Sequence, residues 1–213
     1  MIARLRGLMV LADDAPNWKI DPIDQARAAC EGGASVVQLR AKCATDSVAL
    51  RWAAAIREIT RKFGVGFFVN DRFDLALAAD ADGVHLGQED ISPSRIPMAA
   101  RSRLLIGRST HSLEQARAAC EEPIDYIAFG PIFGTESKTS ACDARGVERL
   151  AAVVRAIQPQ PVIAIGGINL GNVASVAETG VAGVAVISAI AEAADPRADA
   201  RALVDTLREC GGA

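Results

Sequence analysis

The feature that most constrains the fold is the alternation of short apolar runs with longer alanine-rich stretches along the whole chain. The short runs are rich in Val, Ile, Leu and Phe and are bounded by Gly or polar residues, which is typical of buried β-strands. Eight strands are predicted, at residues 8–12, 35–40, 66–70, 83–87, 104–108, 126–130, 161–165 and 183–187. Dividing 213 residues by eight leaves about 27 per unit, enough for a strand, a helix and two short loops.

The stretches between the strands predict amphipathic helices. Several begin with a residue that caps helices, namely Asp21 before Pro22, Asp46, Ser112 and Asn169. Eight βα units without a break in composition predict an α/β fold, a single (β/α)8 TIM barrel domain over residues 1–213. An open doubly wound sheet is the alternative, but no G-x-G-x-x-G motif follows the first strand. The helices are predicted at 21–31, 46–62, 112–121, 145–157 and 169–178.

Composition and charge exclude several classes of protein. The formal net charge of −3, without a dense cationic run, argues against a nucleic-acid partner. Five scattered cysteines without a C-x-x-C pair exclude a zinc or disulfide framework and fit a reducing cytoplasm. The apolar run at the N-terminus is too short for a signal peptide or a membrane span. We therefore expect a soluble cytoplasmic protein with no membrane partner, and a homo-oligomer remains open.

Two acidic residues follow predicted strands and indicate a metal site. Asp71 comes directly after GFFVN at 66–70, and Asp90 closes DGVHLGQED at 82–90. In a barrel, the carboxyl ends of the strands meet at one rim. Two carboxylates about 6 Å apart with no cation repel by roughly 3 kcal/mol at an effective dielectric near 20. The pair therefore suggests Mg²⁺, which prefers oxygen ligands; pairing with Arg or Lys is the alternative.

Other strand ends carry groups that suit anions. Arg40 and Lys42 flank the end of the second strand, where alternation places both side chains on one side. Facing inward they need an anion, unless Arg40 pairs with a neighbouring carboxylate. Gly166-Gly167 after the seventh strand and Ser188 after the eighth predict a phosphate pocket, because backbone N–H groups in such loops hold phosphates in many barrels.

The two histidines are assigned different roles. His85 lies inside a predicted strand and is expected to be a hydrogen-bonded core residue. His111 follows the fifth strand and is a candidate acid or base, although capping of the next helix by Ser112 explains that loop equally well. Lys138 lies in a loop rich in Gly and hydroxyl residues and, taken alone, reads as a solvated lysine.

Together these motifs resemble the thiamine phosphate synthase family. The stretches that carry the resemblance run in family order over nearly the whole chain. They are VQLRAK (37–42), FVNDRFDLAL (68–77), DGVHLGQED (82–90), IGRSTHS (106–112), DYIAFGPIF (125–133), TESK (135–138), IGGI (165–168) and GVAVISAI (183–190).

The resemblance implies an enzyme with two phosphorylated small-molecule partners. It would join a hydroxymethylpyrimidine diphosphate to a hydroxyethylthiazole phosphate and release pyrophosphate, with Mg²⁺ as cofactor bound by Asp71 and Asp90. Arg40, Lys42, Lys138 and Ser109 would be the catalytic residues. The residues that match the family's pyrimidine-diphosphate contacts are Gln38, Arg40, Lys42, Asn70, Ser109 and Lys138. Those that match its thiazole-phosphate contacts are Thr135, Ser137, Gly167, Ile187 and Ser188.

The sequence departs from the family pattern at a few positions. Ala41 stands where an acidic residue is common, Gly134 replaces a proline and Ser137 a threonine, and the first strand lacks the usual Thr-Asp ending. Two other functions remain as alternatives. A thiazole tautomerase of the same superfamily would keep the phosphate pocket and use His111 as base, and a non-catalytic barrel would only bind a phosphorylated ligand.

Overall fold

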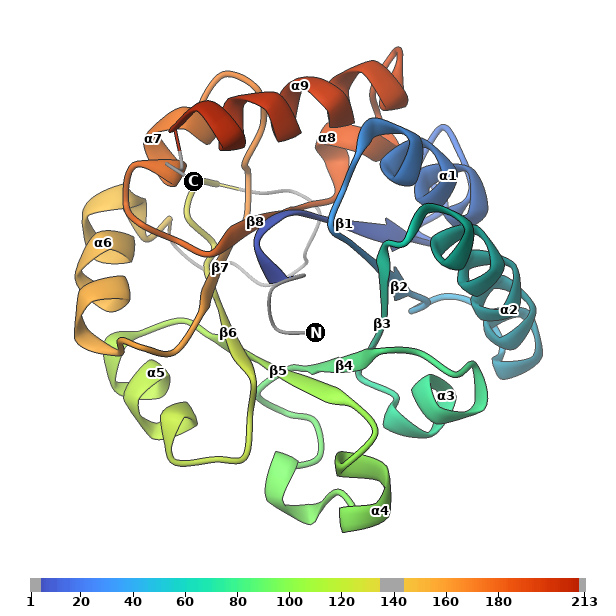
Figure 1. Ribbon diagram of the computed structural model, residues 1–213, viewed down its shortest axis with the longest axis horizontal. Helices are drawn as coiled ribbons and strands as arrows, with labels where there is room; N and C mark the ends of the chain where they lie inside the picture. Colours follow the sequence, from blue (N-terminus) through green and yellow to red (C-terminus); the bar gives the residue numbers. More distant parts are fainter. Residues whose placement is uncertain (1–4, 135–143, 211–213) are drawn as a thin grey trace.

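The alternating elements close into a ring of strands surrounded by helices (Figure 1). The fold is that of a computed structural model, which describes residues 5–134 and 144–210. The eight strands pair in parallel in sequence order, and β1 also pairs with β8, which closes the barrel. The predicted single (β/α)8 barrel is confirmed. The strands are β1 (Gly7–Asp13), β2 (Val36–Arg40), β3 (Gly66–Asn70), β4 (Gly83–Leu86), β5 (Leu105–Thr110), β6 (Tyr126–Phe129), β7 (Val162–Ile165) and β8 (Gly183–Val186).

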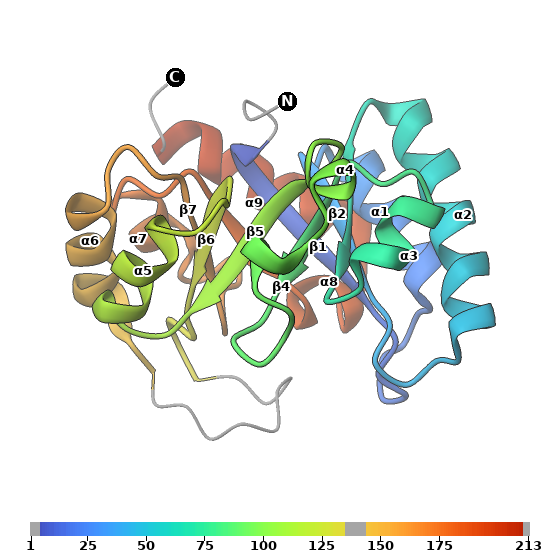
Figure 2. The same cartoon turned by 90° about the horizontal axis from the view of Figure 1, so that it is seen from below.

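The helices form an outer layer around the strands. Figure 2, a view turned by 90°, shows α2 on one flank and α6 on the other, with the strands between them. The helices are α1 (Pro22–Gly32), α2 (Asp46–Phe63), α3 (Phe73–Ala78), α4 (Met98–Arg101), α5 (Leu113–Cys120), α6 (Gly146–Ala156), α7 (Val173–Ala177), α8 (Ser188–Ala191) and α9 (Pro196–Cys210), with a short 3₁₀ helix η2 (Pro93–Arg95).

The predicted strands agree with the observed ones to within two residues at each end. The largest difference is at β5, which extends to Thr110 because its last two residues pair with Ala128 and Phe129 of β6. Among the caps, Asp21 and Ser112 accept backbone N–H groups of α1 and α5 as predicted. The residue at the cap position of α2 is Thr45, so the prediction of Asp46 as the cap is wrong.

The helix predicted from residue 169 begins only at Val173. The side chains of Asn169 and Asn172 bond nearby backbone instead: Asn172 Oδ1 accepts the N–H of Asn169, and Asn169 Oδ1 accepts that of Gly171. Such local bonds compete with the first turn of a helix.

Four helices, α3, α4, α8 and α9, lie outside the segments predicted to be helical. The longest is α9, which begins at Pro196 and buries Leu203 and Leu207 against the barrel. Asp195 accepts the N–H of Ala198 at 3.0 Å and so caps it. This is the Asp-Pro start signal that also begins α1.

Two hydrophobic clusters hold the barrel together. The larger lies between the strands and the helices, and the smaller fills the barrel interior with residues such as Met9, Leu11, Phe68 and Tyr126. Gly107 of β5 makes room for the Tyr126 ring, because a Cβ at residue 107 would lie 2.1 Å from Cζ of that ring. The glycine therefore lets a large side chain lie across the interior below the mouth.

Candidate active site

A cavity of about 340 Å³ lies at the carboxyl ends of the strands, above the smaller cluster. Apolar residues of β1, β6, β7 and β8 form its floor, and polar residues of β2 to β5 and the loop after β4 form its rim. The lining residues are Met9, Leu11, Gln38, Arg40, Lys42, Asn70, Asp71, His85, Gly87, Gln88, Glu89, Asp90, Ser109, Tyr126, Ala128, Ile163, Ile165 and Ala185.

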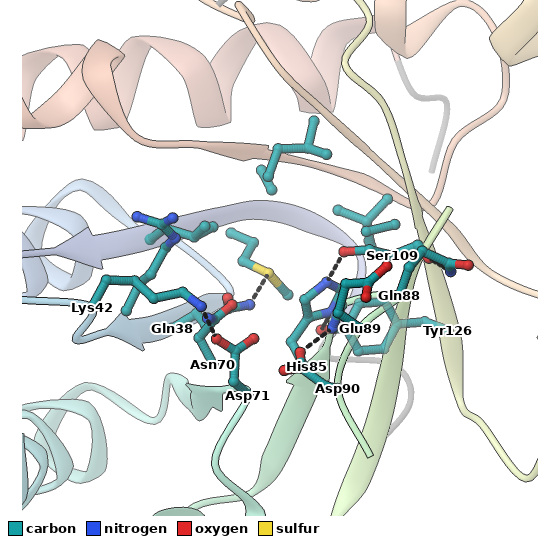
Figure 3. Close-up of a pocket in the computed structure, with 18 residues that line it drawn as sticks. Gln38, Lys42, Asn70, Asp71, His85, Gln88, Glu89, Asp90, Ser109 and Tyr126 are labelled. Atoms are coloured by element: carbon teal, nitrogen blue, oxygen red, sulfur yellow. Dashed lines mark hydrogen bonds and ion pairs between the residues drawn. The ribbon is translucent and has the colours of Figure 1, made fainter. Parts of the chain in front are cut away.

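The cavity brings together residues that the sequence analysis assigned to one site. Seven of them line it, namely Gln38, Arg40, Lys42, Asn70, Asp71, Asp90 and Ser109. Figure 3 shows the side chains of Gln38, Lys42, Asn70, Asp71, Asp90 and Ser109 around the cavity, with Lys42 reaching toward Asp71. Their roles in binding and catalysis stay predictions. Thr135, Ser137 and Lys138 lie outside the described residues.

Asp71 occupies a constrained position at the end of β3. Its φ of 64° lies in the left-handed region, which is uncommon outside glycine and recurs at functional sites. Its N–H donates to the carbonyl of His85 at 2.7 Å, which ties the residue to β4. Burial raises the pKa of the Asp71 carboxyl, the adjacent Asp90 carboxyl raises it further, and the Lys42 ammonium lowers it. The carboxylates are therefore close enough to interact, and Asp71 also has the lysine partner of the alternative interpretation.

Asp90 is held in a tight turn after β4. One of its oxygens, Oδ2, accepts the N–H of Gly87 at 2.6 Å, and its own N–H donates to the Gly87 carbonyl at 3.3 Å. The buried Arg108 donates to the same carbonyl at 2.7 Å and faces Glu122 at 3.5 Å. This turn fixes one carboxylate oxygen of Asp90.

The two acidic side chains fit a magnesium ion. Within residues 5–134 and 144–210, no group of three or more His, Cys, Asp or Glu side chains is placed to hold a metal. A pair of carboxylates nevertheless suits Mg²⁺, which usually takes one or two protein carboxylates and completes its shell with substrate phosphates and water. Asp71 and Asp90 are thus the residues that could hold it.

The cations of β2 and its following loop have carboxylate partners within the protein. Arg40 forms an ion pair with Asp13, and Lys42 with Asp71. The expectation that these cations need a ligand anion is therefore wrong, and the pairing of Arg40 with a neighbouring carboxylate is what the structure shows. Strand alternation does not place Lys42 either, because β2 ends at Arg40. The carboxylate of Asp14 instead accepts the N–H groups of residues 42, 43 and 44 at 2.7–2.9 Å.

Gln38 offers an unused acceptor to a ligand. Its side chain is 1% exposed, and its amide nitrogen donates weakly to the sulfur of Met9 at 3.5 Å. Its Oε1 atom is buried and has no hydrogen-bond partner among the described residues. Buried polar atoms are nearly always bonded, so this oxygen suits a ligand N–H group.

His85 is buried and hydrogen-bonded, as predicted, and it also lines the cavity. Its Nδ1 atom lies 3.0 Å from the hydroxyl of Tyr126, and its Nε2 atom lies 2.9 Å from the hydroxyl of Ser109. The imidazole stacks on the Tyr126 ring with a centroid distance of 5.5 Å. The histidine therefore joins the barrel interior to the rim.

The residues predicted to hold the second phosphate lie on the loops after β7 and β8. Gly167 has a φ of 66°, and a Cβ there would lie 2.5 Å from the carbonyl oxygen of Gly134. Ile187 is buried directly before α8, and Ser188 is the first residue of that helix. Gly167, Ile187 and Ser188 are not among the residues that line the cavity, so the structure places them beside it and does not bring them into it.

His111 points away from the cavity. Its Nδ1 atom lies 2.6 Å from the carbonyl oxygen of Gly130, and the residue lines a different hollow with Arg145 and Arg149. Ser112 caps α5 at 3.2 Å. The capping interpretation of this loop is confirmed.

Several residues of the site were not predicted. Tyr126 and Glu89 line the cavity, and Arg108 supports the turn that holds Asp90, although the sequence predicts no role for them. The partners of the β2 cations could have been predicted from Asp13 and Asp14, because these acidic residues end the strand next to β2.

Among the described residues, no helix is long and apolar enough to cross a membrane.

Comparisons with known proteins identify the family of the chain. A family model described as thiamine monophosphate synthase matches residues 8–190. A thiamine-phosphate synthase of Anaeromyxobacter dehalogenans is 46% identical over 99% of this chain and 91% of its own length. One of Chlorobium phaeobacteroides is 42% identical over 98% of this chain and 99% of its own.

A solved structure gives the same result. The thiamine phosphate pyrophosphorylase of Pyrococcus furiosus superposes with a TM-score of 0.88 and 37% identity, covering 100% of both chains. With the barrel, the cavity and these matches together, the chain belongs to the thiamine monophosphate synthase family of enzymes.

Proposed function

We propose that this enzyme joins 4-amino-2-methyl-5-hydroxymethylpyrimidine diphosphate to 4-methyl-5-(2-hydroxyethyl)thiazole phosphate, giving thiamine phosphate and pyrophosphate. Beyond family membership, one observation carries the proposal: Asp71 and Asp90 share a cavity with Arg40, Lys42 and the unused Gln38 acceptor. This arrangement suits a ligand that carries a diphosphate at one end and N–H groups at the other.

The reaction asks for positioning and charge stabilisation more than for an acid or a base. The exocyclic carbon of the pyrimidine separates from pyrophosphate and becomes cation-like, and the thiazole nitrogen then attacks it. Negative charge grows on the leaving pyrophosphate, and cations fixed in place stabilise it without having to reorganise. Arg40 is fixed by its ion pair with the buried Asp13, so its charge is already oriented.

Asp71 and Asp90 would hold Mg²⁺, which supplies further positive charge to the diphosphate when it is bound. Lys42 lies against Asp71 and would turn from that carboxylate toward the diphosphate. Lys138 is proposed as a third cation on the strength of the resemblance. Ser109 stands at the rim near the expected position of the pyrimidine ring.

The second substrate is proposed to bind through the glycine loop and α8. The positive φ of Gly167 and the crowding around it give a backbone position that only glycine fits easily. The N–H groups of Ser188 and Ala189 begin α8 and have no acceptor within the helix, whereas those of Ile190 and Ala191 donate to the Ile187 carbonyl. Both features suit a phosphate group.

The position of His111 counts against the tautomerase alternative. That reaction needs a base within reach of the thiazole, and His111 lies outside the cavity on the α5 side. The carboxylate pair and the cations would also have no task there.

The test is to mix the purified protein with Mg²⁺ and both phosphorylated precursors and to measure thiamine phosphate and pyrophosphate. We expect equal amounts of the two products, and none when either precursor is left out. Formation of an isomerised thiazole phosphate without coupling would favour the tautomerase. No change in either precursor would favour a barrel that only binds ligands.

A further inference from the structure

Three polar groups are bonded in series from the barrel interior to the rim of the cavity. Tyr126 Oη lies 3.0 Å from His85 Nδ1, and His85 Nε2 lies 2.9 Å from Ser109 Oγ. Figure 3 shows the imidazole between the phenol and the serine. Each of the two hydrogen bonds has one donor and one acceptor, so the donors can run from the phenol to the serine or from the serine to the phenol.

The phenol at the inner end is placed to act as the donor. Tyr126 is fully buried, and burial raises the pKa of its hydroxyl, so the hydroxyl keeps its proton. The ring is locked between Phe68, edge-on at 5.9 Å, and the stacked imidazole. Because a buried O–H group almost always donates to an acceptor, the nitrogen 3.0 Å away is its natural partner.

The tautomer of the histidine follows from that bond. A neutral imidazole has one donor and one acceptor nitrogen. If Nδ1 accepts from the phenol, Nε2 carries the proton and donates to the Ser109 hydroxyl. The serine then accepts from the histidine and has its own O–H left to donate.

We infer that Tyr126 and His85 orient the Ser109 hydroxyl so that it donates a hydrogen bond to an acceptor atom of the ligand in the cavity. The inference rests on the proposed function for the identity of that ligand, the pyrimidine diphosphate. It assigns His85 and Tyr126 as positioning residues and gives Ser109 the role of a donor, not of a base.

The tautomer can be measured on the protein without any ligand. The chain has two histidines, so ¹⁵N labelling of histidine gives two sets of imidazole signals, and a His111→Gln variant identifies those of His85. We expect long-range ¹H–¹⁵N spectra to show the neutral form with the proton on Nε2. A proton on Nδ1, or on both nitrogens at neutral pH, would overturn the inference. If His111→Gln fails to fold, His111→Asn serves the same purpose.

A pair of matched variants tests the same inference in catalysis. His85→Gln keeps an N–H near the position of Nε2, whereas His85→Asn places its amide near Nδ1 and loses the donor. We expect kcat/KM for the pyrimidine diphosphate to fall on the order of tenfold in His85→Asn and in Ser109→Ala, the effect of one hydrogen bond, and to recover in His85→Gln. Equal losses in the glutamine and asparagine variants would contradict a directed bond.

Tyr126→Phe, alone and combined with Ser109→Ala, gives a double-mutant cycle that tests the coupling between the phenol and the serine. It keeps the stacked ring and removes only the hydroxyl, so we expect severalfold lower activity and a mixed tautomer of His85. In the Ser109→Ala background the same change should have almost no further effect. A full second loss there would show that the phenol acts by another route. Because the spectra need no turnover, the inference and the proposed coupling activity can fail separately.

Discussion

The two halves of the barrel mouth present different chemistry to a ligand. From β2 to the loop after β4, the rim carries charged side chains: Arg40 pairs with Asp13, Lys42 pairs with Asp71, and Asp90 lies in the turn after β4. After β7, the described loop carries Gly166 and Gly167, and the backbone at Gly167 is crowded and has a positive φ. One half of the mouth therefore presents charged side chains, and the other presents closely packed backbone.

This difference decides how each half can be tested. In the charged half, Arg40 is paired with Asp13 and Lys42 with Asp71. Removing one member of either ion pair therefore leaves the other without its partner. In the backbone half, Gly167 has no side chain to remove, and an atom has to be added there to disturb it.

The largest expected effect lies at the carboxylate pair. Asp71→Asn should lower kcat about 10³-fold at low Mg²⁺, because a neutral amide binds the ion weakly and the leaving group loses that stabilisation. Adding Mg²⁺ should recover part of the rate, and chelation by EDTA should abolish wild-type turnover. The measurement is the steady-state rate of pyrophosphate release against Mg²⁺ concentration.

Asp74→Asn is the matched control for that substitution. Asp74 lies three residues further along, is exposed and pairs with Arg72 outside the cavity. It should leave the Mg²⁺ dependence unchanged. If both variants keep wild-type rates at limiting Mg²⁺, the charged half does not hold the ion.

The second effect concerns the stability of the charged half. Arg40→Met should lower the free energy of unfolding by about 3 kcal/mol, because Asp13 is 1% exposed and would be left as a buried carboxylate without its ion pair. Arg103→Met removes a cation that is 62% exposed and 3.8 Å from its partner, so it should change stability by less than about 0.5 kcal/mol. Urea unfolding of both variants measures this difference in stability. Equal unfolding midpoints would show that the buried pair contributes no more than the exposed one.

The sequence predicts the barrel because each strand repeats the same local signal. Apolar runs bounded by Gly or polar residues mark all eight strands to within two residues. The short helices α3 and α4 give too few turns for a periodic pattern. The longer α9 carried a usable signal in Asp195 before Pro196, the same pair of residue types that starts α1.

The part of the site that the sequence predicts follows from one rule: residues at the carboxyl ends of barrel strands meet at one rim. This rule places Asp71, Asp90 and Ser109 together, and the structure brings them to one cavity. It gives no partners, because the pairing of Arg40 with Asp13 depends on the register between β1 and β2. It also misses Tyr126, which begins β6 at the opposite end and reaches the cavity only because Gly107 leaves space for its ring.

In the backbone half, Gly167→Ala should raise the KM for the thiazole phosphate about tenfold and leave the KM for the pyrimidine diphosphate within about twofold. The added Cβ would lie 2.5 Å from the Gly134 carbonyl and 2.8 Å from Cβ of Phe133, so the loop has to shift. Gly64→Ala is the control, because Gly64 has a similar φ of 69° and no atom within 4 Å of an added Cβ. Both variants should lose about 1 kcal/mol of stability from backbone strain, and only Gly167→Ala should change KM. Equal KM values would place the second phosphate elsewhere.

The smallest expected effect tests whether the charged half depends on a residue that does not line the cavity. Arg108 donates to the Gly87 carbonyl at 2.7 Å and thereby supports the turn in which Gly87 holds Asp90 Oδ2. Arg108→Met should raise the Mg²⁺ concentration for half-maximal rate about threefold while leaving the rate at saturating Mg²⁺ nearly unchanged, because the turn loosens but both carboxylates remain. Arg117→Met, an exposed position on the next helix, should change neither quantity. A fall in the saturated rate with an unchanged Mg²⁺ requirement would mean that Arg108 supports the fold in general. The shifted requirement alone would show that this half of the mouth is held in place by bonds to backbone as well as by its ion pairs.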